Sequence, residues 1–208
     1  MGNKVIPIRG FYFITDSTLS RQGNIKDVQD ALDCGVKIIQ YRNKVASTRT
    51  LYEEALRLRR ICQGVIFLIN DRLDIALACD ADGVHLGKED LPCSVVRRFL
   101  GRDKIIGVTV RSLKEAKQAQ DEGADYLGIG PIFVTRTKSD AARPLGLQVI
   151  RKIKKQVSLP IVAIGGINSS NAALVVEAGA DAICAISAVV ASKDVKKEIT
   201  RFQGLFTG

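Results

Sequence analysis

Short, nearly continuous apolar runs alternate with helical patterns along the whole chain, and this alternation limits the folds open to it. Such runs are typical of strands buried on both faces, as in a parallel sheet covered by helices. We predict eight strands, at Phe11–Thr15, Val36–Tyr41, Val65–Asn70, Gly83–Leu86, Lys104–Val110, Tyr126–Gly130, Ile161–Gly165 and Ala182–Ile186. Between them the apolar residues recur at three and four positions, as in Leu51, Ala55, Leu58 and Cys62, which indicates amphipathic helices.

Helices are predicted at Thr48–Gln63, Ser112–Glu122, Leu147–Gln156 and Ser170–Ala178, with a last one from about Val195 to Phe206. Eight strand–helix units in 208 residues match the smallest closed barrels of this type. We therefore predict an α/β fold, a single-domain TIM (β/α)8 barrel with parallel strands over residues 1–208. The alternative is a doubly wound open sheet, but the turn after the first strand lacks the G-x-G-x-x-G dinucleotide fingerprint.

A short internal repeat favours the closed barrel. The copies are Cys-Asp-Ala-Asp-Gly-Val (79–84), Gly-Ala-Asp-Tyr-Leu (123–127) and Gly-Ala-Asp-Ala-Ile (179–183), with a weaker copy at 34–36. They precede the fourth, sixth, eighth and second predicted strands, and a repeat on every second strand fits a barrel whose interior layers come from alternate strands. Asp82, Asp125 and Asp181 are therefore expected at the amino-terminal end of the barrel, in a structural role.

Composition excludes several classes of protein. Apolar residues make up 46% of the chain, too many for a disordered protein. The net charge of +9 is compatible with anionic substrates, whereas 5% aromatic residues and no Trp argue against a nucleic-acid surface. No transmembrane segment or signal peptide is recognisable, and the five cysteines have neither metal-site nor disulfide spacing. We expect a cytoplasmic protein that binds small phosphorylated molecules, with no nucleic acid and no membrane as partners; a homo-oligomer is left open.

The carboxyl ends of barrel strands form the active site in this fold, so polar residues there are candidates for chemistry. Asp71 and Asp90 follow neighbouring strands, and Mg²⁺ is usually held by one or two carboxylates together with water and phosphate. Arg42 and Lys44 follow the second strand and suit phosphate oxygens. Together they predict a magnesium diphosphate site. A set of salt bridges at the strand ends is the alternative.

A second group of residues predicts a phosphate monoester site. Gly165 and Gly166 let the backbone approach a ligand closely, and Ser187 follows the next strand, where this fold often binds phosphate. The segment 133–138 opens a loop that runs to Gly146, and its hydroxyls and lysine could clamp phosphate over the barrel mouth. A surface excursion is the alternative. His85, the single histidine, is read either as an acid–base group or as a strand-end side chain satisfied by its neighbours.

At these strand ends the sequence resembles the thiamine-phosphate synthase family, and the likeness extends over nearly the whole chain. It rests on YFITD (12–16), QYRNK (40–44), LINDR (68–72), DGVHLGKED (82–90), GADYLGIGPIF (123–133), TRTKSDA (135–141), PIVAIGGI (160–167) and AISAV (185–189). The resemblance implies a TIM-barrel transferase of thiamine biosynthesis. Such an enzyme joins 4-amino-2-methyl-5-hydroxymethylpyrimidine diphosphate to thiazole phosphate, or to its carboxylated form. The product is thiamine phosphate, and pyrophosphate is released in a substitution of dissociative character.

The resemblance also implies roles for individual residues. One Mg²⁺ per subunit would be held by Asp71 and Asp90. The catalytic residues would be Arg42, Lys44, Thr109 and Lys138. The pyrimidine diphosphate would be bound by Gln40, Tyr41, Arg42, Asn43, Lys44, Asn70, Thr109 and Lys138. The thiazole phosphate would be bound by Thr135, Arg136, Thr137, Gly166, Ile186 and Ser187.

The sequence departs from the family pattern in two places. The fifth strand of the family commonly ends in Ser, one residue and His, whereas this chain has Thr109-Val110-Arg111. Lys88 stands where Gln is common. We hypothesise that both added cations tighten diphosphate binding. Two other functions stay open on the same fold: a thiazole tautomerase, which uses a histidine that Arg111 replaces, and a non-catalytic sensor of phosphate ligands. A barrel with a Glu–Lys acid–base pair, as in tryptophan synthesis, is a more distant alternative.

Overall fold

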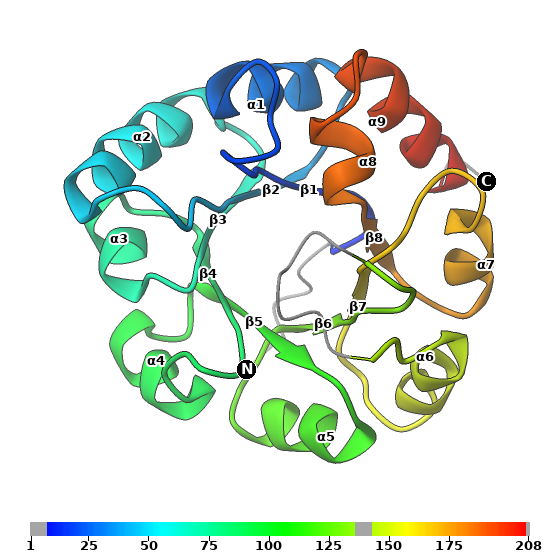
Figure 1. Ribbon diagram of the computed structural model, residues 1–208. Helices are drawn as coiled ribbons and strands as arrows, with labels where there is room; N and C mark the ends of the chain where they lie inside the picture. The colour runs from blue at the N-terminus through cyan, green and yellow to red at the C-terminus, as the bar shows by residue number, and fades with distance from the viewer. Residues whose placement is uncertain (1–7, 136–142, 207–208) are drawn as a thin grey trace.

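The structure is a computed structural model that describes residues 8–135 and 143–206. Its eight strands form a closed, all-parallel barrel in sequence order, in which β8 pairs with β1 (Figure 1). The strands are β1 (Gly10–Ile14), β2 (Ile38–Tyr41), β3 (Ile66–Asn70), β4 (Gly83–Leu86), β5 (Ile105–Val110), β6 (Tyr126–Ile129), β7 (Ile161–Ile164) and β8 (Ala182–Cys184). The predicted TIM barrel is confirmed, and each predicted strand matches an observed one to within about two residues at either end.

Helices surround the barrel as an outer ring (Figure 1). They are α1 (Asn24–Asp33), α2 (Thr48–Ile61), α3 (Leu73–Ala78), α4 (Cys93–Leu100), α5 (Leu113–Asp121), α6 (Leu147–Lys154), α7 (Ala172–Glu177), α8 (Ile186–Val190) and α9 (Val195–Gln203). Serine side chains cap the start of α2 and α5. Ser47 and Ser112 accept hydrogen bonds from the N–H groups of Thr50 and Glu115, respectively. The last predicted helix ends earlier than expected, because Gly204–Phe206 forms a 3-10 turn.

Glycine makes room for large side chains inside the barrel. The Tyr126 ring lies against Gly107 on the adjacent strand, where a Cβ atom would clash with the ring. Tyr12 and Tyr126 are both fully buried, and their rings are 5.9 Å apart. The barrel interior is thus a packed core of side chains, as expected for eight strands.

The repeated aspartates connect three odd-numbered strands, β3, β5 and β7, to the next even-numbered strand at the amino-terminal end of the barrel. Asp82, Asp125 and Asp181 each accept a hydrogen bond from a strand N–H, at 2.8, 2.7 and 2.8 Å. The donors are Phe67 in β3, Ile106 in β5 and Ile161 in β7. Each carboxylate also pairs with a basic residue of the preceding even-numbered helix, namely Arg59, Arg97 or Lys154. This confirms the structural role predicted for the repeat.

The weaker copy of the repeat has no aspartate, and a different side chain supplies the missing acceptor. Lys37 stands immediately before β2, where the other copies carry an acidic residue. The N–H of Phe11 in β1 instead donates to Oε1 of Gln203 in α9, at 3.0 Å. At this fourth copy of the repeat, the strand N–H therefore binds a side chain of α9 instead of an aspartate.

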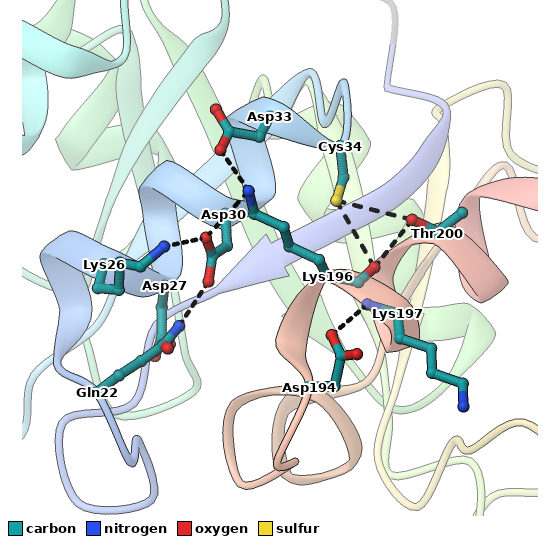
Figure 2. Close-up of polar contacts among 10 residues, drawn as sticks. All are labelled: Gln22, Lys26, Asp27, Asp30, Asp33, Cys34, Asp194, Lys196, Lys197 and Thr200. Carbon is teal, nitrogen blue, oxygen red and sulfur yellow. Dashed lines mark hydrogen bonds and ion pairs between the residues drawn. The ribbon is translucent and has the colours of Figure 1, made fainter.

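A polar cluster joins α1 to α9 where the ring of helices closes (Figure 2). The Gln22 amide nitrogen donates to Asp27 at 2.9 Å and to Asp30 at 2.8 Å. Lys196 of α9 pairs with Asp33 at 2.7 Å and reaches Asp30 at 3.6 Å. Burial raises the pKa of Asp27, whereas Asp30, with Lys26 and Gln22 bound to it, has a lowered pKa despite its burial.

Two expectations about the whole chain can be compared with the structure. All five cysteines are free thiols, and all except Cys34 are buried. Within the described ranges, every helix is too short or too polar to cross a lipid bilayer.

Candidate active site

The carboxyl ends of β3 and β4 bring Asp71 and Asp90 together. Asp71 directly follows β3 in a left-handed backbone conformation, with φ of 60°, and its N–H donates to the His85 carbonyl at 2.8 Å. Asp90 lies in the loop after β4 and accepts a hydrogen bond from the Gly87 N–H at 2.6 Å. The two carboxyl groups are in direct contact, and Lys44 forms an ion pair with Asp71.

This arrangement suits a divalent cation held with water and phosphate. Burial would raise the pKa of Asp71, but contacts with Lys44 and Asp90 outweigh it and the pKa is lowered. Burial and the neighbouring Asp71 raise the pKa of Asp90. A bound cation would relieve the effect of the Asp71 carboxylate on Asp90, which fits a cation shared by the two side chains. Among residues 8–135 and 143–206, no group of three or more His, Cys, Asp or Glu side chains is placed to hold a metal ion. A cation at this carboxylate pair would need further ligands, such as water or substrate phosphate.

Arg42 follows β2, two residues before Lys44, and is held by a residue for which we predicted no role. Its guanidinium pairs with Asp16, which follows β1, and the Arg42 side chain is only 13% exposed. The Thr15 hydroxyl contacts both the N–H and the carbonyl of Arg42, at 2.8 and 3.1 Å. Lys44 is 53% exposed. The Arg42 guanidinium is therefore held in place by its neighbours, whereas about half of the Lys44 side chain is exposed to solvent.

The predicted substrate ligands on β2 and on the loop after it point in different directions. Gln40 is 1% exposed, and its amide nitrogen donates to the Tyr12 hydroxyl inside the barrel. Tyr41 lies on the opposite face of β2, where its hydroxyl donates to Glu54 of α2 at 2.5 Å. The side-chain oxygen of Asn43 accepts hydrogen bonds from the backbone N–H groups of Val45 and Ala46 in the same loop, at 3.2 and 3.1 Å. Tyr41 and Asn43 therefore contact α2 and the loop, whereas Gln40 faces the barrel interior.

A buried chain of hydrogen bonds connects Gln40 to Thr109. The Tyr12 hydroxyl lies 2.7 Å from that of Tyr126, which lies 2.8 Å from Nδ1 of His85. Nε2 of His85 is 2.9 Å from the Thr109 hydroxyl. His85 is thus satisfied by its neighbours on both ring nitrogens. The two tyrosines were not predicted, because each reads as one more apolar residue in a buried strand.

The remaining candidates on this side of the mouth are Asn70, Lys88 and Arg111. Asn70 ends β3 and pairs in register with His85. Lys88 is exposed in the loop after β4. The Arg111 guanidinium donates to the carbonyls of Gly130, at 3.3 Å, and Arg143, at 2.9 Å. Arg111 therefore links the end of β6 to the segment that leads into α6.

The carboxyl end of β7 contains the glycine pair. Gly165 and Gly166 have φ of 97° and 67°, a region that favours glycine. A Cβ atom on Gly166 would clash with the Val134 carbonyl, and the Phe133 N–H donates to the Gly165 carbonyl at 3.0 Å. The pair therefore permits close packing of the segment after β6.

Three other residues assigned to the thiazole phosphate lie within the described ranges. Ile186 and Ser187 form the first turn of α8, directly after β8. Thr135 is half-buried at the end of the first described range. Arg136, Thr137 and Lys138 lie outside the described residues.

Comparisons with known proteins identify the family of the chain. The family model described as thiamine monophosphate synthase matches residues 11–189. A thiamine-phosphate synthase of Methanosarcina barkeri is 53% identical over 92% of this chain and 88% of its own length. A thiamine-phosphate synthase of Chloroflexus aurantiacus is 51% identical over 93% and 91%. The solved structure of thiamine phosphate pyrophosphorylase from Pyrococcus furiosus superposes with a TM-score of 0.87, at 43% identity and 95% coverage of both chains. The chain therefore belongs to the thiamine monophosphate synthase family.

Proposed function

We propose that the protein condenses 4-amino-2-methyl-5-hydroxymethylpyrimidine diphosphate with thiazole phosphate, or its carboxylated form, to give thiamine phosphate and pyrophosphate. The bond between the pyrimidine methylene carbon and the diphosphate oxygen breaks, and that oxygen keeps the electron pair. The thiazole nitrogen then donates its lone pair to the same carbon. The aminopyrimidine ring can delocalise the developing cation, so no protein nucleophile is needed.

One observation carries the proposal: the paired carboxylates Asp71 and Asp90 with Lys44 lie on the β3–β4 side, and the glycine pair follows β7. In the closed eight-strand order, β3 and β7 are on opposite sides of the barrel. A diphosphate and a monophosphate bound at these two places would present their reacting atoms to each other over the barrel. Such positioning converts a reaction between two substrates into a local step.

The residues on the diphosphate side fit this role. Asp71 and Asp90 would hold Mg²⁺, which when bound neutralises charge on the leaving pyrophosphate. The Asp16 carboxylate keeps the Arg42 guanidinium at the mouth, where its remaining N–H groups can bind phosphate oxygens. Lys44, which pairs with Asp71 and is half-exposed, would add a second positive charge on this side of the mouth. Lys138 stays a prediction.

On the opposite side, Gly166 with the first turn of α8 would bind the thiazole phosphate through backbone N–H groups. The helix begins at Ile186, just after β8, so its first turn lies at the same end of the barrel as the glycine pair after β7. Thr135 would add a hydroxyl, and Arg136 and Thr137 stay predictions. A cytoplasmic location also stays a prediction, and the oligomeric state stays open.

An in vitro synthesis assay tests the proposal. Protein, both substrates and Mg²⁺ are mixed, and thiamine phosphate is oxidised to fluorescent thiochrome. We expect product that depends on Mg²⁺ and is abolished by EDTA, because an unneutralised pyrophosphate is a poor leaving group. Folded protein that forms no product beside a working positive control would contradict the proposal and favour the tautomerase or the sensor. The names of the relatives and the presence of Arg111 instead of histidine favour the synthase.

Arg111→His tests whether the extra cation contributes to diphosphate binding. We expect the KM for the pyrimidine diphosphate to rise about 5- to 10-fold, which corresponds to about 1 kcal/mol of lost attraction. Steady-state kinetics with each substrate varied in turn gives the two KM values. Arg111→Lys is the matched variant, because it keeps the charge and loses the planar group that contacts Gly130 and Arg143. An unchanged diphosphate KM in Arg111→His would refute the hypothesis.

A further inference from the structure

Five side chains from five strands form one continuous hydrogen-bonded chain across the barrel, below the proposed site. In order they are Gln40 of β2, Tyr12 of β1, Tyr126 of β6, His85 of β4 and Thr109 of β5. Every link is between 2.7 and 2.9 Å. Only the two ends, Gln40 and Thr109, belong to the residues assigned to the pyrimidine substrate. The three central residues have no role in the function proposed above.

The direction of the hydrogen bonds follows from the groups at each link. The Gln40 amide nitrogen can only donate, so the Tyr12 oxygen accepts at that link. Burial raises the pKa of both Tyr12 and Tyr126, so both hydroxyls keep their single proton. Among the described residues, the Tyr12 hydroxyl has Gln40 and Tyr126 as its hydrogen-bond partners. Its proton is therefore donated to Tyr126.

The same reasoning continues to the other end of the chain. The Tyr126 oxygen accepts from Tyr12, so its own proton is donated to Nδ1 of His85. A neutral imidazole that accepts at Nδ1 carries its proton on Nε2, and this proton is donated to the Thr109 oxygen. The Thr109 hydroxyl proton is then directed to a different acceptor. The chain thus makes Thr109 a donor and leaves the Gln40 carbonyl oxygen as an acceptor.

We propose that Tyr12, Tyr126 and His85 are positioning residues that fix the hydrogen-bonding direction of Gln40 and Thr109 toward the pyrimidine substrate. A substrate ring with a donor on its β2 side and an acceptor on its β5 side matches this pattern, as an aminopyrimidine can. The part that concerns the substrate rests on the proposed function. The orientation of the chain itself is a property of the free protein.

The first experiment measures the His85 tautomer by ¹⁵N NMR without any substrate. His85 is the only histidine in the sequence, so ¹⁵N-histidine labelling gives two ring-nitrogen signals that need no further assignment to a residue. We expect Nε2 to be protonated and Nδ1 to be unprotonated in the wild-type protein. Tyr126→Phe removes the donor to Nδ1, and we expect both shifts to move toward those of a mixture of tautomers. A proton on Nδ1 in the wild type, or unchanged shifts in Tyr126→Phe, would overturn the proposal.

The second experiment is a double-mutant cycle in the synthesis assay. Tyr126→Phe is expected to lower kcat about 10-fold without changing the KM for thiazole phosphate, because the group it positions lies on the pyrimidine side. Since part of its effect passes through Thr109, Tyr126→Phe combined with Thr109→Val should lose less activity than the product of the two single losses. Additive losses, or an equal rise of both KM values, would show general loosening of the fold and overturn the proposal.

Two controls separate the possible failures. Tyr52→Phe removes a hydroxyl from a partly exposed tyrosine of α2, and activity should be unchanged. The Tyr126→Phe protein keeps the ring that packs against Gly107, and thermal unfolding verifies that it is folded. If the wild type makes no thiamine phosphate but shows the expected tautomer, the proposed function fails while the orientation of the chain stands.

Discussion

Asp71→Asn is expected to lower kcat/KM for thiamine phosphate synthesis by at least about 100-fold, equivalent to about 2.7 kcal/mol in the transition state. The substitution replaces one carboxylate of the proposed cation site by a neutral amide. It also removes the ion pair with Lys44, which lies at the same diphosphate position. The Asp71 backbone has φ of 60°, a conformation that Asn tolerates better than Ala, so the loss is chemical and not conformational. Steady-state kinetics at several Mg²⁺ concentrations measures it.

Asp80→Asn is the matched control for this substitution. Asp80 also has positive φ, at 50°, and also pairs with a lysine, Lys104. Its side chain is 83% exposed and precedes β4, at the end of the barrel opposite the proposed site. We expect its activity to equal that of the wild type. An Asp71→Asn protein whose kcat/KM stays within twofold of the wild-type value at all Mg²⁺ concentrations would rule out a catalytic cation at Asp71.

Asp125→Ala is expected to lower the free energy of unfolding by about 3 kcal/mol. Asp125 accepts hydrogen bonds from the Ile106 N–H at 2.7 Å and from Arg97 at 2.5 Å, and its side chain is 24% exposed. Ile106 is fully buried, so its N–H would lose its partner without gaining access to water. The Arg97 guanidinium would keep its contacts to backbone carbonyls but lose its counter-charge. Urea unfolding followed by circular dichroism measures the change.

Asp121→Ala serves as the control for stability. Asp121 is an exposed residue at the end of α5, near Asp125 in the chain, and we expect a change within about 0.5 kcal/mol. Asp82→Ala and Asp181→Ala should destabilise less than Asp125→Ala, because their side chains are more exposed, at 31% and 30%. Equal stability of Asp125→Ala and Asp121→Ala would mean that the repeated aspartates do not hold the strands.

The fold could be predicted from the sequence because its signals are local and repeated. Each buried parallel strand needs a continuous apolar run, and each covering helix needs its own apolar stripe. Each strand and helix can therefore be predicted from its own segment of the sequence. The repeat around Asp82, Asp125 and Asp181 predicts, from sequence alone, that these residues lie at the amino-terminal end of the strands. The location of Asp71 and Asp90 at the mouth of the barrel could be predicted for the same reason, because residues that follow a parallel strand lie at its carboxyl end.

The contacts inside the barrel could not be predicted in this way. Tyr12 and Tyr126 are 114 residues apart in sequence, and their hydroxyls meet only because the sheet closes with one particular register. Gly107 makes room for the Tyr126 ring only where β5 and β6 pair residue by residue. Asp16 fixes Arg42 across two neighbouring strand ends. The local sequence pattern determined which strand carries each polar residue. Only the tertiary structure decided which of these residues are in contact, because the register of the strands and the closure of the barrel depend on packing throughout the core.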